Sequence, residues 1–492
     1  MSDEGPSDAP EPSRADVFAS RRRKLKSLRA AGVEPFPHEF AGVEPIAQVR
    51  AQHSSLEPGQ ETSSEHRVAG RLSARRGQGR MAFLDLVDRS GRIQLQARVD
   101  ELGQEGMEQL LELDLGDIVG VDGVAFCTRR GELSLRVIRY QLLAKSLRPP
   151  PEKHHGLRDV ETRFRHRELD LVASEEAREL FVLRARVITA VRRYLDCAGF
   201  VEVETPVLQP LYGGALARPF TTHHNALDRT LYLRIATELY LKRLIVGGLE
   251  RVYELGKDFR NEGVDSTHNP EFTMLEFYEA YADYQAIASR CEELVAFVAS
   301  EIGYSGPIDF SPPWRRETVA GAILDRTGID IRGQREVESL RSEMKSRGLP
   351  APEEDDWAGL VDELVAKHVE PTLAEPTFLL DYPVELSPFA KRHRTEDGLV
   401  ERFEAYVSGM EIANAFTELN DPDEQRRRFE EQRTLARKGD EEAQPFDDAF
   451  LEALELGMPP TGGIGIGIDR LVMALTGRQS IREIVLFPAM RD

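Results

Sequence analysis

The stretch from Phe259 to Tyr278, FRNEGVDSTHNPEFTMLEFY, constrains the fold most strongly, because it predicts two strands joined by a polar loop. Alternation with a period of two places Arg260 and Glu262 on one face of the first strand, and it places Glu276 inside an apolar and aromatic second strand. A solvated antiparallel hairpin is the alternative. An unpaired carboxylate in such a run would be costly to bury, so Glu276 favours a buried cationic partner or a ligand.

The length of 492 residues predicts two or three domains with ample core. Only Cys127, Cys197 and Cys291 are present, without a CxxC pair, which fits a reducing compartment and predicts neither disulfides nor a zinc site. We find no signal peptide and no run of membrane-spanning length, so we expect a cytoplasmic protein without a membrane partner. The net charge of −21 argues at first against nucleic acid, unless basic groups are concentrated locally.

Two segments precede the first predicted domain. Residues 1–14 are rich in Ser, Pro, Asp and Glu and predict a disordered tail. Residues 15–65 predict a helical segment that contains a short basic helix over Ser20–Gly32, with Ser as its cap and Gly at its end. Such a charge run is either a solvated face or a contact with RNA phosphates.

Residues 66–145 predict a small β-barrel, because five short alternating runs follow one another and Gly-containing turns separate them. A helix is expected in the third gap, around Glu105–Leu113. The basic groups that the net charge conceals lie in the first run and the turn after it: Arg71, Arg75, Arg76 and Arg80. Phe83 is either a core residue or a stacking platform for an unpaired base.

Residues 146–173 predict a linker, and residues 174–492 predict a second domain. Ser174 is the expected cap of a helix that ends at Gly199, whose apolar stripe fits either core packing or an interface. His223 and His224 are expected to be structural, because neighbours on a strand point to opposite faces. Residues 283–373 are interpreted as a solvated helical insertion.

The segment Glu401–Glu424 predicts a hairpin that turns at Ser408 and Gly409. This register makes Glu404 and Glu411 diagonal neighbours on one face, where a divalent cation would relieve their repulsion. Two exposed acids on a half-wet sheet are the alternative. Simple alternation places Asn414 and Glu418 on the face opposite to Glu411. Either a bulge intervenes or these two residues line a different side of the site.

Near the C-terminus, Gly463, Gly465 and Gly467 alternate with isoleucines and predict a strand with one bare face, against which a planar ligand could lie. Arg470 follows at a helix start, where it opposes the helix dipole and therefore suggests another role. Glu238 lies in another buriable segment and, like Glu276, needs an internal partner.

Three of these stretches together resemble the signature motifs of class II aminoacyl-tRNA synthetases. In their amino-acid sequence they resemble the lysyl-tRNA synthetases in particular. GFVEVETPVLQP (Gly199–Pro210) is similar to the first motif, FRNEG with HNPEFT and LEFY to the second, and GGIGIGIDRLVMAL (Gly462–Leu475) to the third. Similar wording runs from about Val68 to the C-terminus. The resemblance implies an α+β protein with a five-stranded OB-type β-barrel and a catalytic domain built on an antiparallel sheet flanked by helices. It also implies a homodimer, built by the helix that ends at Gly199 and the strand after it.

The resemblance implies that L-lysine and ATP form lysyl-adenylate and that lysine then passes to the 3′ end of tRNA(Lys). Arg260 and Arg470 match the catalytic arginines. The implied lysine-binding residues are Gly214, Glu238, Glu276, Tyr278, Asn414 and Glu418. The implied ATP-binding residues are Arg260, Glu262, His268, Asn269, Phe272, Glu404, Glu411 and Arg470, of which Glu404 and Glu411 would hold Mg²⁺.

For the tRNA, Phe83, Gln94 and Glu132 match anticodon-reading positions, and Arg76 lies close to a basic one. One residue departs from the pattern: Thr267 stands where many bacterial members carry Arg, which leaves the γ-phosphate contact to Mg²⁺, His268 or Arg470. Two other functions are the alternatives. A relative that attaches a lysine-like group to a protein would lack the barrel of residues 66–145, and a non-enzymatic RNA-binding paralogue would be expected to have lost Arg260, Glu411 or Arg470.

Overall fold

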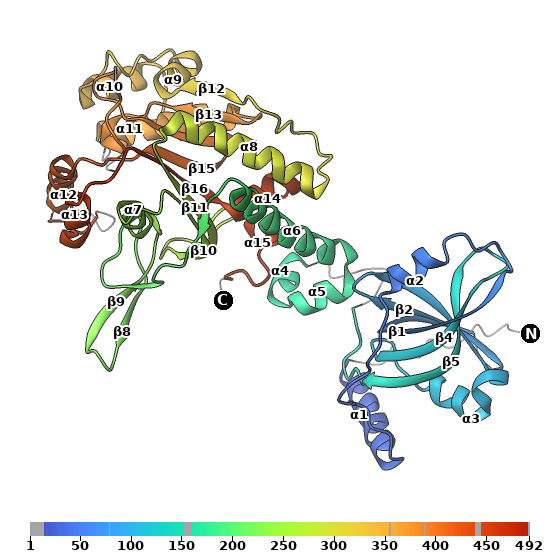
Figure 1. The fold of residues 1–492 in the computed structure, drawn as a ribbon. Helices are drawn as coiled ribbons and strands as arrows, with labels where there is room; N and C mark the ends of the chain where they lie inside the picture. The colour runs from blue at the N-terminus through green and yellow to red at the C-terminus, as the bar shows by residue number, and fades with distance from the viewer. Residues whose placement is uncertain are drawn as a thin grey trace, which may run out of the picture. The chain divides into compact units, whose positions relative to one another are not determined.

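The computed structural model describes residues 14–77, 79–151, 159–353, 356–387, 389–437 and 444–490 (Figure 1). The chain divides into two compact units, Met1–Arg178 and Glu179–Asp492. The predicted disordered tail lies almost wholly outside the described residues. Among the residues described, no helix is long and apolar enough to cross a membrane.

The first unit contains the predicted barrel. Five strands close in the order β1-β2-β3-β5-β4. They are β1 (Glu61–Arg76), β2 (Met81–Asp88), β3 (Gly91–Arg98), β4 (Ile118–Cys127) and β5 (Leu133–Ala144). The helix α3 (Val99–Leu111) fills the third gap, as predicted, and a short helix α2 (Ile46–Gln52) precedes β1. Alternate strand residues point inward and form one apolar core, which also takes in Met107 and Leu110 of α3.

The basic helix near the N-terminus, α1, spans Arg14–Ala30. The prediction that it starts at Ser20 is wrong, because residues 14–19 continue the helix and Phe18 lies beneath the guanidinium groups of Arg22 and Arg148. Its end is as predicted: Gly32 adopts φ 77°, and the Val33 N–H bonds to the Leu28 carbonyl.

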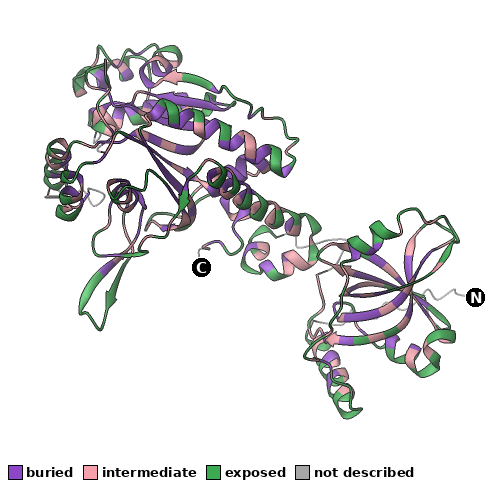
Figure 2. Cartoon of the chain, in the orientation of Figure 1, coloured by how far each residue is buried: buried purple, intermediate pink, exposed green. Residues whose placement is uncertain are grey.

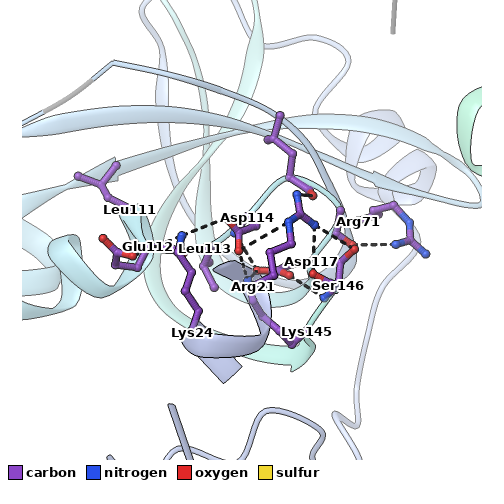
Figure 3. A network of polar contacts seen from close by, with 12 residues as sticks. Arg21, Lys24, Arg71, Leu111, Glu112, Leu113, Asp114, Asp117, Lys145 and Ser146 are labelled. Atoms are coloured by element: carbon purple, nitrogen blue, oxygen red, sulfur yellow. Dashed lines mark hydrogen bonds and ion pairs between the residues drawn. The ribbon is translucent and has the colours of Figure 1, made fainter. Parts of the chain in front are cut away.

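A buried charge cluster fixes α1 to the base of the barrel (Figure 3). Lys145 lies between Asp114 and Asp117, at 2.5 and 2.7 Å. From α1, Lys24 reaches Asp114 at 3.0 Å, and Arg21 donates to the Leu115 and Ser146 carbonyls. Two cations of the helix therefore complete a network whose other members belong to the barrel.

The predicted linker contains two short helices, α4 (Val160–Arg165) and α5 (Arg167–Ala173). The long helix α6 (Glu175–Cys197) follows. Ser174 caps it as predicted, because its hydroxyl accepts the Ala177 N–H at 3.1 Å.

The second unit is organised around an eight-stranded sheet of order β12-β13-β14-β15-β16-β11-β10-β6. All neighbours are antiparallel except β10 with β6 and β12 with β13. The strands are β6 (Val201–Glu202), β10 (Arg251–Phe259), β11 (Glu271–Ala280), β12 (Arg315–Thr318), β13 (Thr377–Leu380), β14 (Arg402–Val407), β15 (Met410–Thr417) and β16 (Thr461–Gly467). A separate small sheet holds β7 (Leu208–Gln209), β8 (Thr221–His224) and β9 (Arg229–Leu233), and Figure 2 shows the β8–β9 hairpin to be largely exposed.

Helices cover one face of the large sheet. A single apolar core joins α6, α8 (Tyr284–Ile302) and α14 (Ile468–Thr476) to alternate residues of β11, β14, β15 and β16. The remaining helices are α7 (Glu238–Val246), α9 (Val319–Thr327), α10 (Val337–Ser346), α11 (Trp357–Leu364) with a π-helical turn at Val365–Val369, α12 (Pro422–Arg437), α13 (Asp448–Glu455) and α15 (Ile481–Ile484).

The interpretation of residues 283–373 as a solvated appendage is wrong. The helix α8 buries Ile287, Leu294 and Val298 completely in the main core, and β12 is the edge strand of the large sheet. Residues of α9, α10 and α11 form a second core with β13 and β14. The mixed charged texture of this segment reflects helices with only one buried face.

Candidate active site

The face of the large sheet opposite α8 and α14 carries a cavity of about 410 Å³. Strand alternation explains its lining, because Leu275 and Phe277 of β11 point into the helix-covered core while Glu276 and Tyr278 point the other way. All fourteen catalytic-domain residues predicted from the sequence line this cavity. They are Gly214, Glu238, Arg260, Glu262, His268, Asn269, Phe272, Glu276, Tyr278, Glu404, Glu411, Asn414, Glu418 and Arg470.

The hairpin of β14 and β15 turns at Ser408 and Gly409, as predicted, and both residues have positive φ. Tyr406 pairs with Glu411, whereas Glu404 pairs with Asn414. The register shifts between these pairs, so a bulge adds one residue to β15. The bulge brings Glu411 and Asn414 to the same face and resolves the parity conflict left open by the sequence.

At one end of the cavity, Glu404 and Glu411 lie near each other but have different partners. Glu404 accepts the hydroxyl groups of Tyr382 at 2.7 Å and Tyr406 at 2.6 Å, and it forms an ion pair with Arg402. Glu411 binds Arg470 at 2.9 Å. Burial, and next the charge of Glu404, raise the pKa of Glu411.

This pair suits a Mg²⁺ ion that completes its coordination with phosphate oxygens and water. Both side chains offer carboxylate oxygens, the donors that Mg²⁺ prefers, and their mutual repulsion raises the cost of holding both charges together without a cation. Within the described residues, no group of three or more His, Cys, Asp or Glu side chains could hold a metal by itself. A metal ion held by Glu404 and Glu411 would therefore need further ligands, such as substrate oxygens and water.

Where the chain reaches the cavity, β10 ends at Phe259, so Arg260 and Glu262 lie in the loop rather than on the strand that the sequence predicts. Arg260 still donates its N–H to the Pro270 carbonyl, which holds the loop closed. Its guanidinium lies 5.0 Å from the ring centre of Phe272, and its Nε is buried without a hydrogen-bond partner among the described residues. A buried donor in this state is suited to an anionic ligand.

Around His268, the loop is fixed by Asp265, whose carboxylate accepts the N–H groups of Thr267 and His268. These bonds lower the pKa of Asp265 to about 2 against the opposing effect of burial. His268 contacts Asp265 through Nδ1 at 2.9 Å and Arg470 through Nε2 at 3.2 Å. The Asn269 side chain has a structural role, because its amide binds the backbone of Glu271 and Ala489.

At the opposite end of the cavity, three acids are buried close together. Glu276 accepts the Thr237 N–H at 2.9 Å and the Tyr278 hydroxyl at 3.1 Å, so the partners it has are neutral donors rather than the cation expected as one alternative. Glu238 has the internal partner that the sequence called for, Lys242, at 2.6 Å. Burial raises the pKa of Glu276 and of Glu418 to about 8.

The strand β16 forms a bare floor beneath these groups, as its glycines predict. Gly465 pairs with Glu276 on one side and with Asn414 on the other. A Cβ on Gly463 would lie 2.1 Å from a Glu418 oxygen, whereas one on Gly465 would make only ordinary contacts. Gly463 is therefore needed for the close approach of Glu418 to the sheet.

Sequence reasoning missed two residues of this site. Lys242 lies behind Glu238 and Glu418, and its only sequence signal is the i, i+4 spacing from Glu238. Arg402 joins Glu404 to Asn414, whose side-chain oxygen accepts its Nε–H at 3.1 Å. His223 and His224 lie on the exposed strand β8, away from the cavity lining.

On the barrel, the predicted anticodon residues share its outer face. Phe83 pairs with Arg76 across β1 and β2, and Phe83 is half-buried rather than part of the core. Gln94 accepts a hydrogen bond from Ser134 at 3.0 Å, and Glu132 lies two residues before Ser134, on the same side. Of the predicted basic patch, Arg71 and Arg75 donate to backbone carbonyls, and Arg76 and Arg80 pair with Asp85 and Asp100.

Comparison with known proteins agrees with this architecture. Residues 159–491 match the family model of tRNA synthetases class II (D, K and N), and residues 66–148 match that of the OB-fold nucleic acid binding domain. The chain is thus a class II tRNA synthetase with an OB-fold nucleic acid binding domain.

Curated relatives narrow the assignment. The chain is 51% identical to the lysine–tRNA ligase of Moorella thermoacetica over 97% of this chain and 98% of the relative. It is 52% identical to the enzymes of the same name from Chloroflexus aurantiacus, over 97% and 98%, and Roseiflexus castenholzii, over 97% and 99%. The chain belongs to the lysine–tRNA ligase family of class II synthetases.

Proposed function

We propose that the protein activates L-lysine with ATP and transfers the lysyl group to tRNA(Lys). The observation that carries the proposal is the distribution of charge in the cavity. At one end Glu238, Glu276 and Glu418 have one ion-paired cation among the described residues, Lys242, whereas at the other end Glu404 and Glu411 are paired with Arg402 and Arg470. An amino acid with two ammonium groups would bind the acidic end. Its carboxylate would then point toward Arg260, whose buried Nε has no hydrogen-bond partner among the described residues.

The proposed reaction begins with attack of the lysine carboxylate on the α-phosphorus of ATP, which forms lysyl-adenylate and releases pyrophosphate. A ribose hydroxyl at the 3′ end of tRNA then takes the lysyl group and releases AMP. Both reactants of the first step are anions, so alignment and charge neutralisation matter more than a general base. Arg260 is assigned to the carboxylate and α-phosphate because its planar fork can bind both.

ATP is proposed to lie along the remaining part of the cavity. Phe272 and Arg470 would stack on adenine from opposite sides, while Glu262 and the backbone near Asn269 read its edge. Glu404 and Glu411 would hold Mg²⁺, which supplies charge neutralisation to the phosphates when bound. With Thr267 bound to Asp265, His268 and Arg470 are the remaining side chains of this loop region for the γ-phosphate.

We assign anticodon recognition to Phe83, Gln94, Glu132 and Arg76. A half-buried ring beside amide, carboxylate and guanidinium groups suits stacking on an unpaired base and reading of its edge. The presence of this barrel disfavours a relative that modifies a protein instead of tRNA.

We also propose a homodimer built on α6 and the chain that follows it. Exposed apolar side chains gather along this part of the sequence, with Val182 61%, Val201 49% and Leu208 48% exposed. Sedimentation of the purified protein tests the mass directly. The exposed Cys197 and the buried Cys127 and Cys291, all free, support a reducing location such as the cytoplasm.

Pyrophosphate exchange into ATP, measured with each of the twenty amino acids in turn, tests the proposed activity. We expect exchange with lysine and none with aspartate or asparagine, the substrates of the other members of the matched class. Exchange with aspartate or asparagine instead would refute the assignment of the acidic pocket. A second assay with tRNA(Lys) then tests the transfer step.

A further inference from the structure

A buried lysine belongs to the acidic end of the cavity. Lys242 is on α7, and its Nζ lies 2.6 Å from Glu238 Oε1 and 2.5 Å from Glu418 Oε2. Its side chain is 0% exposed, and the ring of Phe389 covers it at 5.6 Å. The cation therefore bridges two acids that come from segments 180 residues apart (418 − 238).

Each of these acids has a second carboxylate oxygen that Lys242 does not contact in an ion pair. Glu238 Oε2 lies toward Gly214, 3.7 Å from the position that a Cβ on this glycine would occupy. Glu418 Oε1 lies against Gly463. Both glycines line the cavity. Both Glu418 oxygens are buried without a geometrically ideal hydrogen bond among the described residues, but Oε2 has the ion pair with Lys242 whereas Oε1 has none, so the oxygen at the wall of the cavity needs a donor.

When all three acids of this end are ionised, their charges are not balanced without a ligand. Glu238, Glu276 and Glu418 supply three carboxylates, Lys242 supplies one cation, and Tyr278 adds only a hydroxyl group. Two additional ammonium groups would balance three ionised acids. A ligand with a single ammonium would leave one acid uncompensated.

We propose that Lys242 is a positioning residue that sets the charge of the amino-acid pocket. It occupies one oxygen of Glu238 and one of Glu418, turns their other oxygens toward the substrate, and makes the pocket complementary to a molecule with two ammonium groups. The inference rests on the proposed function and extends it, because it assigns the preference for a diammonium substrate to a residue that does not line the cavity. The competing interpretation is that Lys242 is only a structural ion pair.

The test is Lys242→Met, a neutral replacement of similar length, assayed by pyrophosphate exchange in the full-length protein. Without the cation, the pKa values of Glu238 and Glu418 rise, because Lys242 lowers both against the effect of burial. Binding of the ammonium groups requires these acids to ionise, and this costs more free energy when their pKa values are higher, so the KM for lysine should rise ~10-fold or more at pH 7 while the KM for ATP stays nearly constant. The KM for lysine should continue to fall with rising pH beyond the range in which the wild type levels off.

A second readout is discrimination against norleucine, which lacks the ε-ammonium. The preference for lysine over norleucine should shrink in Lys242→Met, since a neutral Glu418 loses little when it stays unpaired. Lys145→Met is the matched control, because Lys145 is also buried between two carboxylates but lies in the barrel. It should lower the melting temperature without changing either KM in the exchange reaction.

Lys242→Gln replaces Lys242→Met in these assays if the Met variant does not fold, since glutamine keeps an N–H donor without the charge. An unchanged KM for lysine with an unchanged pH profile would overturn the inference, and so would failure of both variants to fold. Absence of lysine-dependent exchange in the wild type would instead refute the proposed function.

Discussion

The imidazole of His268 faces the guanidinium of Arg470, with 3.2 Å between Nε2 and Nη2. Because a guanidinium can only donate, Nε2 of His268 is the acceptor and the ring proton resides on Nδ1, which lies 2.9 Å from Asp265. Asp265 therefore fixes the tautomer of His268, and His268 in turn orients Arg470. The same guanidinium also contacts Glu411, so the loop between β10 and β11 is joined to the proposed metal site.

His268→Ala should weaken ATP use more than lysine use. Loss of the contact frees Arg470. We expect kcat/KM for ATP to fall by a factor that corresponds to ~1.5 to 3 kcal/mol of lost transition-state stabilisation, the range for hydrogen bonds to charged groups. Exchange rates at varied ATP and varied lysine measure the difference. His224→Ala, on the exposed strand β8, is the control, and equal losses for both substrates would contradict the assignment.

Glu411→Gln should raise the Mg²⁺ concentration needed for half-maximal activation. The substitution removes one carboxylate charge while keeping the size of the side chain, so the metal site weakens with little change of shape. A Mg²⁺ titration of the exchange reaction measures this. An unchanged titration midpoint would show that Glu404 and Glu411 are not the metal pair.

Glu418→Gln should raise the KM for lysine far more than the KM for ATP. Glutamine fits the space beside Gly463 but supplies no charge, and breaking a buried pair costs ~2 to 5 kcal/mol. The fold should persist, because Lys242 keeps Glu238 as an ion-pair partner and repulsion among the pocket acids decreases. If the two KM values rose together, Glu418 would not be the partner of the ε-ammonium.

The pH dependence of Glu276 gives a test without a substrate. Burial raises its pKa to about 8, far above that of an unfolded glutamate, so the folded protein holds more protons than the unfolded chain between about pH 4.5 and 8. Stability of the ligand-free protein should therefore fall as pH rises through this window, and Glu276→Gln should flatten the fall. Added lysine should counteract it most at the upper end, where ionised acids pair with its ammonium groups. Melting temperatures from pH 5 to 9 measure both effects.

Phe83→Ala should impair tRNA charging and leave lysine-dependent exchange nearly unchanged. Activation of lysine does not require the anticodon, and loss of one base stack costs ~1 to 3 kcal/mol of binding. Phe126 on β4 is buried, so its ring cannot take over base stacking from the half-buried Phe83. Equal losses in both assays would overturn the assignment of the barrel to tRNA.

Features that depend on short sequence patterns were predictable. The barrel, the turn at Ser408 and Gly409, and the bare strand of Gly463 and Gly465 all follow from periodicity and turn chemistry. The resemblance to a known family brought together site residues that lie more than 200 positions apart, such as Gly214 and Glu418.

The rest depends on tertiary context. A bulge adds a residue without a repeating pattern, so the common face of Glu411 and Asn414 could not be derived from alternation alone. The i, i+4 pair of Glu238 and Lys242 is indistinguishable in sequence from a pair on a solvated helix. The burial of α8 was missed because a helix with one apolar face looks the same whether it covers a small core or a large sheet.

The charge cluster beneath the barrel has a consequence for shortened versions of the chain. A chain that began after Ala30 would lose Arg21 and Lys24 while retaining Asp114 and Asp117, of which Asp117 is 0% exposed. Lys145 alone would then face both acids, and the Leu115 and Ser146 carbonyls would lose the donor that Arg21 provides. A chain that began at Ser20 would keep both cations and lose the contacts of Phe18 with Arg22 and Arg148, whereas a truncation point beyond Lys24 would remove the cations that complete the network at the barrel.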